Sequence, residues 1–297
     1  MTSRTGRRLP GPIHSKSPSG STSVWAISDA SRARTDSTTG RSAAEPADGR
    51  TSLGLADIAS SGAAMIRALT FDTYGTVVDW RGSVLGELRT LAERHAPSLD
   101  CVRFLEEWRA VYRPAMDKVN QGESPWITVD AIYRQRLEEL LLAHGVAGLT
   151  ADEIATLSRV WWRLAPWPDA VASLLRLKRR YILSPLSNAS FIGMVELARF
   201  AGLPWDCIIT AENARCYKPR PEVYRTAVSL LGLRPDEVMM VAAHNYDLAA
   251  ARREGMATAF VPRPFEFGPG QKTDLEPESA WDVVAKSFED LAARLGC

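Results

Sequence analysis

Four sets of polar residues stand where short strand-like or loop segments end, and together they could carry out covalent catalysis. Asp72 follows the apolar run IRALTF, Ser187 and Asn188 close YILSPLSN, Lys218 precedes a proline, and Asp247 opens DLAAARREG. These residues supply a nucleophilic carboxylate, a hydroxyl and amide pair, a cation and a second carboxylate. Such a set is suited to a reaction that proceeds through an aspartyl ester.

The segments around these residues predict the sheet that must position them. Strand-like runs alternate with helical runs such as PEVYRTAVSLLG, and this alternation is typical of an α/β fold with a doubly wound, Rossmann-like parallel sheet. Ligands of such sheets bind at the carboxyl ends of the strands. The polar residues fall at these ends, so we expect them to share one edge of the sheet.

A helical block interrupts the sheet after its first strand. Residues 83–96 and 101–113 read as helices, and Pro114 limits the second of them. The segments VDAIYRQRLEELLLAHG and TADEIATLSRVWWRL read as two more. We therefore predict an inserted helical cap. The expected α/β core covers 65–80 and 167–297, and the expected cap covers 81–166.

Residues 1–64 differ in composition from the rest of the chain. They are rich in Ser, Arg, Gly and Pro and have few large apolar side chains, so they cannot bury enough surface to offset their ordering entropy. The many arginines and few acids are typical of a transit peptide. A disordered tail or a mis-assigned start are the other readings, because Met65 directly precedes the first strand, and we favour these.

Composition and charge exclude several classes of protein. The chain has 297 residues and a formal net charge of +1, so nothing indicates nucleic acid or an anionic membrane as a partner. No apolar run reaches the roughly 18 residues of a membrane helix. The four cysteines are scattered without a C-x-x-C pair, which predicts reduced thiols in a cytoplasmic protein.

Four ordered segments carry a resemblance to a known family. FDTYGT, LSNAS, YKPRPEVY and VAAHNYDLAAA resemble the motifs of the haloacid dehalogenase (HAD) superfamily, and more narrowly those of the type II (S)-2-haloacid dehalogenases. The resemblance covers nearly everything from residue 65 to the C-terminus. It implies a HAD core with a cap and a homodimer. It also implies hydrolysis of a short 2-haloalkanoic acid to the 2-hydroxy acid with inversion, without a cofactor.

Two positions differ from the phosphatases of the same superfamily. Those enzymes carry a second acid two residues after the nucleophile and a magnesium-binding acid four residues before the last aspartate; here these positions hold Tyr74 and Ala243. Phosphoryl transfer needs a cation to neutralise charge, whereas a halide leaves carbon without one. We therefore expect no metal. A magnesium-dependent phosphatase and a catalytically silent binding protein stay as alternatives.

The resemblance also implies roles for individual catalytic residues. Asp72 would attack the α-carbon and form an ester, which water then hydrolyses. Lys218 would keep Asp72 ionised, since a nearby cation favours the charged carboxylate, and Asp247 would position the water. Thr76 would support the loop after the first strand. Arg109, in the cap segment EEWRAVY, would meet the departing halide.

Other residues are expected to hold the substrate. Ser187 and the backbone amides after Asp72, beginning at Thr73, would bind the substrate carboxylate, and Asn188 would donate to the halide. His244 replaces an asparagine of the relatives, and either positions water or caps a helix. The expected apolar walls are Tyr74, Trp126 and Tyr246.

Overall fold

The computed structural model describes residues 65–297, and the predictions made for residues 1–64 lie outside the described residues. Six strands form one sheet in the order β5-β4-β1-β6-β7-β8, and every neighbouring pair runs parallel. The predicted doubly wound parallel sheet is therefore confirmed. Its strands are β1 (Ala68–Phe71), β4 (Ile182–Ser187), β5 (Ile209–Thr210), β6 (Val238–Ala242), β7 (Ala257–Phe260) and β8 (Val283–Val284).

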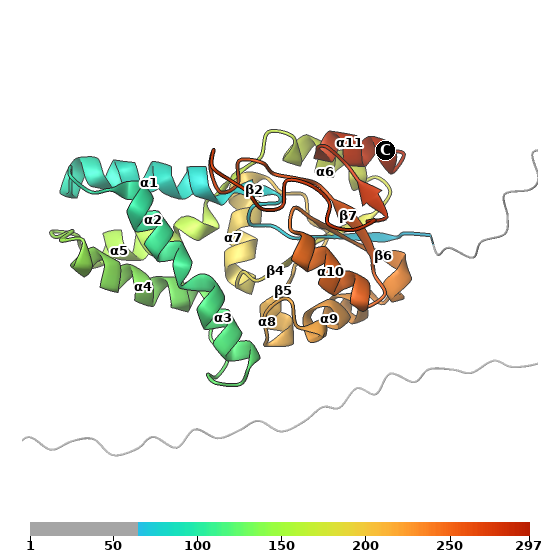
Figure 1. Cartoon of the computed structure of the whole chain (residues 1–297), viewed down its shortest axis with the longest axis horizontal. Helices are drawn as coiled ribbons and strands as arrows, with labels where there is room; N and C mark the ends of the chain where they lie inside the picture. The colour runs from blue at the N-terminus through green and yellow to red at the C-terminus, as the bar shows by residue number, and fades with distance from the viewer. Residues whose placement is uncertain (1–64) are drawn as a thin grey trace, which may run out of the picture. The chain divides into compact units, whose positions relative to one another are not determined.

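Helices cover both faces of this sheet, with α6 and α11 on one side and α8, α9 and α10 on the other (Figure 1). Successive residues of β1 face opposite sides, so Leu69 and Phe71 join one hydrophobic cluster and Ala68 joins the other. Both faces are buried, and the strands are accordingly rich in apolar residues, as in β6, whose sequence is VMMVA. The helices of the core are α6 (Ala170–Leu177), α7 (Phe191–Ala201), α8 (Ala211–Ala214), α9 (Pro221–Leu231), α10 (Asn245–Arg253) and α11 (Phe288–Arg294), with a short 3₁₀ turn η2 (Pro235–Glu237).

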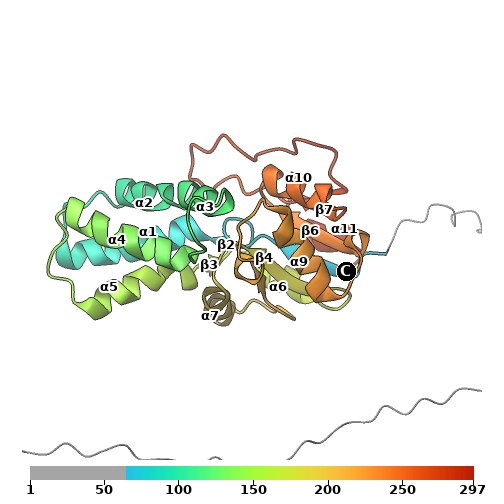
Figure 2. The ribbon, with the colours of Figure 1, turned by 90° about the horizontal axis from the view of Figure 1, so that it is seen from below.

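A helical insertion follows the first strand, as predicted (Figures 1 and 2). The chain enters and leaves it through a two-stranded antiparallel ribbon, in which Val78 pairs with Pro166 and Asp79 with Ala165. The exact limits of a cap domain, 81–166, stay a prediction. The ribbon is β2 (Val78–Asp79) with β3 (Ala165–Pro166), and the insertion contains α1 (Trp80–His95), α2 (Cys101–Ala110), α3 (Tyr112–Asn120), α4 (Val129–Ala143), α5 (Ala151–Ser158) and the 3₁₀ turn η1 (Arg159–Trp162).

The predicted helix over 101–113 is in fact two helices. Helix α2 ends at Ala110, and α3 begins at Tyr112 and continues to Asn120. Pro114 does not end a helix but lies in the first turn of α3, where backbone N–H groups have no partner within the helix. The break at Val111 matters for the site, because Tyr112 then contacts the core.

None of the helices within 65–297 combines the length and the apolar character that crossing a membrane would require.

Candidate active site

The carboxyl ends of β1, β4 and β6 form the centre of the site. In the sheet register Phe71 lies beside Pro185 on one side and Val241 on the other. The residues just beyond these strands therefore meet at one edge, and the amide of Asp72 donates to the carbonyl of Val241 at 3.0 Å. This is the edge where open parallel sheets bind ligands.

Asp72 accepts hydrogen bonds on both carboxylate oxygens. Its Oδ1 receives Lys218 Nζ at 2.8 Å, and its Oδ2 receives Thr76 Oγ1 at 2.7 Å and faces His244 Nδ1 at 2.9 Å. Burial disfavours the charged carboxylate, but the cation of Lys218 and then His244 outweigh burial and hold the pKa of Asp72 below its usual range. Asp72 is 6% exposed, so this ionised carboxylate keeps a small accessible surface.

Lys218 lies between two carboxylates. Its Nζ donates to Asp72 and to Asp247 Oδ2, while Asp247 Oδ1 accepts from the Tyr224 hydroxyl. Burial lowers the pKa of Lys218, but Asp247 and Asp72 together raise it above its usual value. Burial raises the pKa of Asp247, against the effect of Lys218. A carboxylate with a raised pKa is a better base, which is the property that a water-positioning residue needs.

Asp247 does not begin its helix, as the sequence suggested, because α10 starts two residues earlier at Asn245. It still lies in the first turn, where the helix dipole favours negative charge.

Thr76 is fixed in a definite orientation. The amide of Ala243 donates to Thr76 Oγ1 at 3.0 Å, so the hydroxyl proton points to Asp72 Oδ2. Thr76 is fully buried, and its carbonyl accepts from the Arg263 Nε at 2.9 Å. The loop after β1 is thus held from both sides.

The ring of His244 lies between two carboxylates. Its Nδ1 faces Asp72 Oδ2, and its Nε2 faces Glu266 Oε2 at 2.8 Å. Burial lowers the pKa of His244, but Glu266 and Asp72 outweigh it and raise this pKa well above its usual value. Although His244 occupies the position before α10, its side chain makes no capping bond to the helix. The helix-cap alternative for its side chain is therefore wrong.

Arg109 extends from α2 into an aromatic enclosure. Its guanidinium lies 3.7 Å above the Tyr112 ring and donates to the Tyr133 hydroxyl at 3.1 Å. A hollow of about 300 Å³ adjoins it, lined in part by Trp80 and Phe267. Arg109 is therefore not a solvated surface arginine, and its predicted contact with halide stays a prediction.

Ser187 and Asn188 lie at the end of β4 and are both buried. Ser187 Oγ accepts the amide of Ala189 at 3.2 Å. Asn188 accepts the backbone amide of Lys218 at 2.9 Å and donates to the Tyr112 hydroxyl at 3.2 Å. Asn188 thus links the Lys218 loop to the cap, and the substrate-binding roles of both residues stay predictions.

The residues following Asp72 are also buried. Thr73 uses its carbonyl to accept the amides of Val77 and Val78, which closes the turn after β1. Tyr74 donates its hydroxyl to the carbonyl of Trp161 at 2.8 Å.

The two other predicted walls, Tyr246 and Trp126, have different neighbours. Tyr246 is 38% exposed and lies between the His244 ring, at 5.8 Å, and Arg113 of the cap, at 5.1 Å. Trp126 packs on Tyr217, with ring centroids 4.7 Å apart. Its contact is thus with the residue preceding Lys218, on the cap side of that loop.

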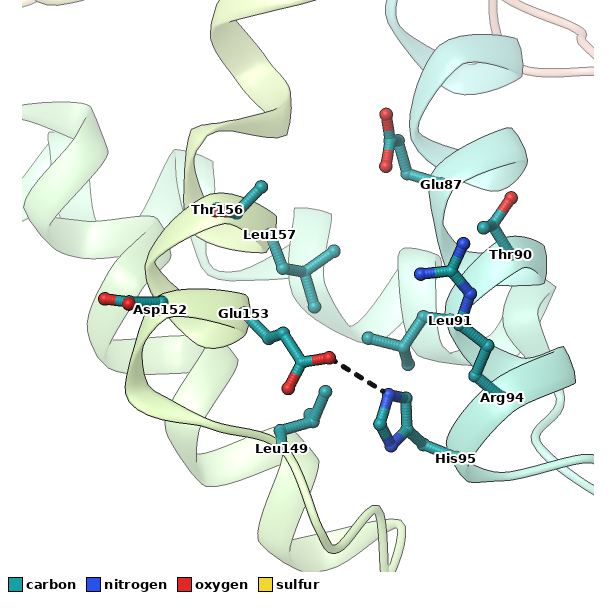
Figure 3. A pocket seen from close by; sticks show the side chains of 10 residues that line it. All are labelled: Glu87, Thr90, Leu91, Arg94, His95, Leu149, Asp152, Glu153, Thr156 and Leu157. Atoms are coloured by element: carbon teal, nitrogen blue, oxygen red, sulfur yellow. Dashed lines mark ion pairs between the residues drawn. The ribbon is translucent and has the colours of Figure 1, made fainter.

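A separate groove lies within the cap, between α1 and α5 (Figure 3). It contains the ion pair of His95 with Glu153, at 3.4 Å, and exposed charged groups around it. None of the residues that line this groove belongs to the four sequence motifs, so we do not place the chemistry there.

Three residues of the site were not predicted from the sequence. Tyr224 lies three residues after Pro221 in α9, so helical spacing on the YKPRPEVY motif could have indicated it. Tyr112 instead follows the break between α2 and α3. Glu266 lies in the irregular segment after β7 and carries no local signal. That segment runs to the cap side, where Phe267 packs on Trp80 with ring centroids 5.9 Å apart (Figure 2).

The geometry agrees with the family comparison. A family model for haloacid dehalogenase-like hydrolases matches residues 66–255. The chain belongs to the haloacid dehalogenase-like hydrolases. The resemblance inferred from the four motifs is thereby confirmed for this hydrolase.

Several known proteins are similar to this hydrolase. It is 29% identical over 211 residues to the (S)-2-haloacid dehalogenase of Xanthobacter autotrophicus, covering 67% of this chain and 76% of that protein. The solved structure of the L-2-haloacid dehalogenase PA0810 is 45% identical, with a TM-score of 0.75, covering 77% of this chain and 98% of that one. The defluorinating L-2-haloacid dehalogenase Rha0230 is 43% identical, with a TM-score of 0.75 and coverage of 78% and 96%.

Proposed function

We propose that this hydrolase is an (S)-2-haloacid dehalogenase that converts a short 2-haloalkanoic acid into the 2-hydroxy acid. The observation that carries the proposal is the arrangement of Asp72, Lys218 and Asp247 at the end of β1, with one accessible carboxylate held ionised by a buried cation. Relatives that cover most of the chain are themselves named for this activity.

Asp72 Oδ1 is the nucleophile. Its partner oxygen, Oδ2, accepts from Thr76 and faces His244, whereas Oδ1 accepts from Lys218. Oδ1 attacks the α-carbon from the face opposite the halogen, the carbon–halogen bond breaks with its electron pair on the halide, and the configuration inverts. A carboxylate fixed by three donors reaches this geometry with little loss of entropy at the moment of attack.

The ester is then hydrolysed at the Asp72 carboxyl carbon. Asp247 takes a proton from water, and the oxygen of that water adds to the carbon. The bond to Oδ1 breaks, so Oδ1 departs with the product, and Lys218 Nζ, 2.8 Å from it, donates the proton that forms the hydroxyl. Lys218 regains a proton from its hydrogen-bonded partner Asp247. The carboxylic acid formed on Asp72 still carries the second proton of the water, and it releases this proton to solvent as it returns to its ionised form.

The two positions that carry acids in the phosphatases hold Tyr74 and Ala243 here, and neither side chain is a carboxylate. Tyr74 donates to the carbonyl of Trp161, and Ala243 offers only a methyl group, while its amide is bound to Thr76. Within residues 65–297 no group of three or more His, Cys, Asp or Glu side chains is arranged to hold a metal ion.

The decisive experiment measures halide release from (S)- and (R)-2-chloropropionate in the presence of EDTA. We expect release from the (S) form, with the (R)-2-hydroxy acid as product. Hydrolysis of p-nitrophenyl phosphate that depends on Mg²⁺, without halide release, would refute the proposal. A single turnover in H₂¹⁸O adds a second measurement, because the label should enter Asp72 and not the product.

The homodimer implied by the family resemblance also stays a proposal. Sedimentation velocity of the purified protein would test it.

A further inference from the structure

We infer that His244 is the oxyanion donor for hydrolysis of the Asp72 ester and that Glu266 positions it and keeps it charged for this step. The inference rests on the proposed function, since it concerns the second half of the same reaction. His244 touches a reacting atom, Asp72 Oδ2, and is therefore a catalytic residue; Glu266 acts through His244 and is a positioning residue.

The hydrogen-bond geometry requires a doubly protonated ring. Nδ1 lies 2.9 Å from Asp72 Oδ2, and Nε2 lies 2.8 Å from Glu266 Oε2. Ionised carboxylates only accept hydrogen bonds, so the ring donates from both nitrogens and carries a positive charge. The imidazolium thus directs one N–H at the oxygen that does not attack the substrate.

Asp72 Oδ2 has a second donor in the Thr76 hydroxyl, at 2.7 Å. After Oδ1 has formed the ester, Oδ2 remains as the ester carbonyl oxygen, with both donors already in place. When water adds to the carboxyl carbon, the electron pair of this carbonyl moves onto Oδ2. Donors fixed where negative charge develops stabilise that charge without reorganisation, as in an oxyanion hole.

Glu266 is needed because ester formation removes the charge of Asp72. The imidazolium has therefore lost one of its two anionic partners before ester hydrolysis begins, and Glu266 is the partner that remains. Its other oxygen, Oε1, accepts from the Trp80 indole at 3.0 Å, and its side chain is 2% exposed. The carboxylate is therefore held by the cap side of the site and shielded from water.

Gly75 allows Glu266 to approach this closely. It has a φ of 90°, and a Cβ at this position would overlap the Glu266 carboxylate. A glycine is required here both by the backbone conformation and by the space that the glutamate fills. The loop after β1 and the segment after β7 are thus shaped around one contact.

The reaction remains balanced. Addition of hydroxide places the electron pair on Oδ2, and the collapse of the intermediate returns it to the carbonyl as the bond to Oδ1 breaks. His244 gives up no proton in this cycle. Its contribution is electrostatic, in contrast to Lys218 and Asp247, which exchange protons with the departing oxygen and the water.

The first test is a single turnover with (S)-2-chloropropionate, in which halide release and ester hydrolysis are timed separately. In His244→Ala we expect hydrolysis to slow by about 10²–10³-fold, the usual effect of losing one oxyanion donor. Halide release should change far less. The ester on Asp72 should then accumulate, seen by mass spectrometry of the intact protein, with a halide burst of one per active site.

His244→Asn is the conservative variant. Its amide can donate to Oδ2 from near the Nδ1 position but carries no charge, so we expect part of the lost hydrolysis rate to return. Parallel slowing of halide release and hydrolysis in both variants, without ester accumulation, would overturn the inference for His244.

The second test is Glu266→Gln, which preserves the shape of the side chain but not its charge. Once Asp72 is esterified in this variant, His244 faces no carboxylate, so burial is left to lower the pKa of its imidazole. Ester hydrolysis should then be slower than in the parent and decline as pH rises, while the parent enzyme stays flat from pH 6 to 8. The other groups facing the ring, Asp72 and Tyr246, are unchanged by this substitution, as are Lys218 and Asp247 beyond Asp72.

Glu254→Gln is the matched control. Glu254 pairs with Arg225 at 2.6 Å at the end of α10, away from the site, so both half-reactions should keep the parent rates. A pH-independent hydrolysis rate in Glu266→Gln would overturn the role of Glu266. A parent enzyme that releases no halide from any 2-haloacid would instead refute the proposed function, so the two failures are distinguishable.

Discussion

Replacing Lys218 by methionine should remove the charge that holds the site together. Its Nζ donates to Asp72 and Asp247, and all three residues are buried, with exposures of 1% for Lys218, 6% for Asp72 and 0% for Asp247. Methionine has a similar length and fills the same space, so the loss of charge dominates the effect. The variant retains two buried carboxylates without the cation between them, and Asp72 keeps His244 as its remaining charged partner.

The expected loss of stability is large. At an effective dielectric of about 20, one close ion pair contributes about 4 kcal/mol of attraction, which desolvation of the ions largely offsets. Removing one partner does not recover the desolvation of the other, and such deletions cost about 3–5 kcal/mol. We expect Lys218→Met to lose this amount in the free energy of unfolding at pH 7.

The loss should also depend on pH with a definite sign. In the parent, the pKa of Asp72 is lowered, so its stabilising effect exists above the unfolded pKa of about 3.9 and is lost as pH falls through the folded value. Without Lys218, the cation that opposes burial at Asp247 is gone, so the pKa of Asp247 rises further and its protonation as pH falls restores part of the stability. The difference between parent and variant should therefore shrink from pH 7 to pH 4.

Urea unfolding at both pH values measures this difference. Lys178→Met is the matched control, because Lys178 pairs with Asp206 at 2.8 Å but both side chains are about one-third exposed, at 35% and 36%. Exposed pairs contribute about 0–1 kcal/mol. If Lys218→Met loses no more stability than Lys178→Met, the reasoning about the buried cation is refuted.

Three further predictions concern the reaction and the loop after β1. Arg109→Ala should slow halide release by about 10²–10³-fold, with partial recovery in Arg109→Lys, and a change of only a few-fold would mean that the halide is held elsewhere. Because the pKa of Asp72 is lowered, single-turnover halide release should stay flat as pH falls from 8 to about 5, and a decline beginning near pH 6 would contradict this ionisation state. Gly75→Ala should destabilise the protein by about 1–3 kcal/mol and displace Glu266, which thermal unfolding and slowed ester hydrolysis would report.

Much of the site could be predicted because its residues follow predicted strands. Asp72 comes directly after β1, and Ser187 and Asn188 lie at the end of β4. The carboxyl ends of parallel strands share an edge, so a strand pattern alone brings these residues near one another. The block of helical segments between these two strands indicated the helical insertion.

The local conformations were predicted less well where two signals compete. Pro114 appeared to end a helix, yet the chain breaks at Val111 and Pro114 lies in the next helix's first turn. Proline is compatible with both outcomes, and the neighbouring packing of α3 selects one. For His244, the position before α10 suggested a capping side chain, but the tertiary partners Asp72 and Glu266 engage the ring instead.

By itself, the sequence determined the parallel sheet and the inserted helices and indicated the pair of Asp72 and Lys218, because periodicity and motif spacing are local properties of the chain. The tertiary structure alone revealed that Glu266, 194 positions from Asp72 in the chain, reaches the same imidazole ring. No residue pattern near Glu266 indicates this contact, since it is created by the path of the segment after β7 and by the space left at Gly75. A charge relationship between distant residues depends on distance in the folded chain, and only folding sets that distance.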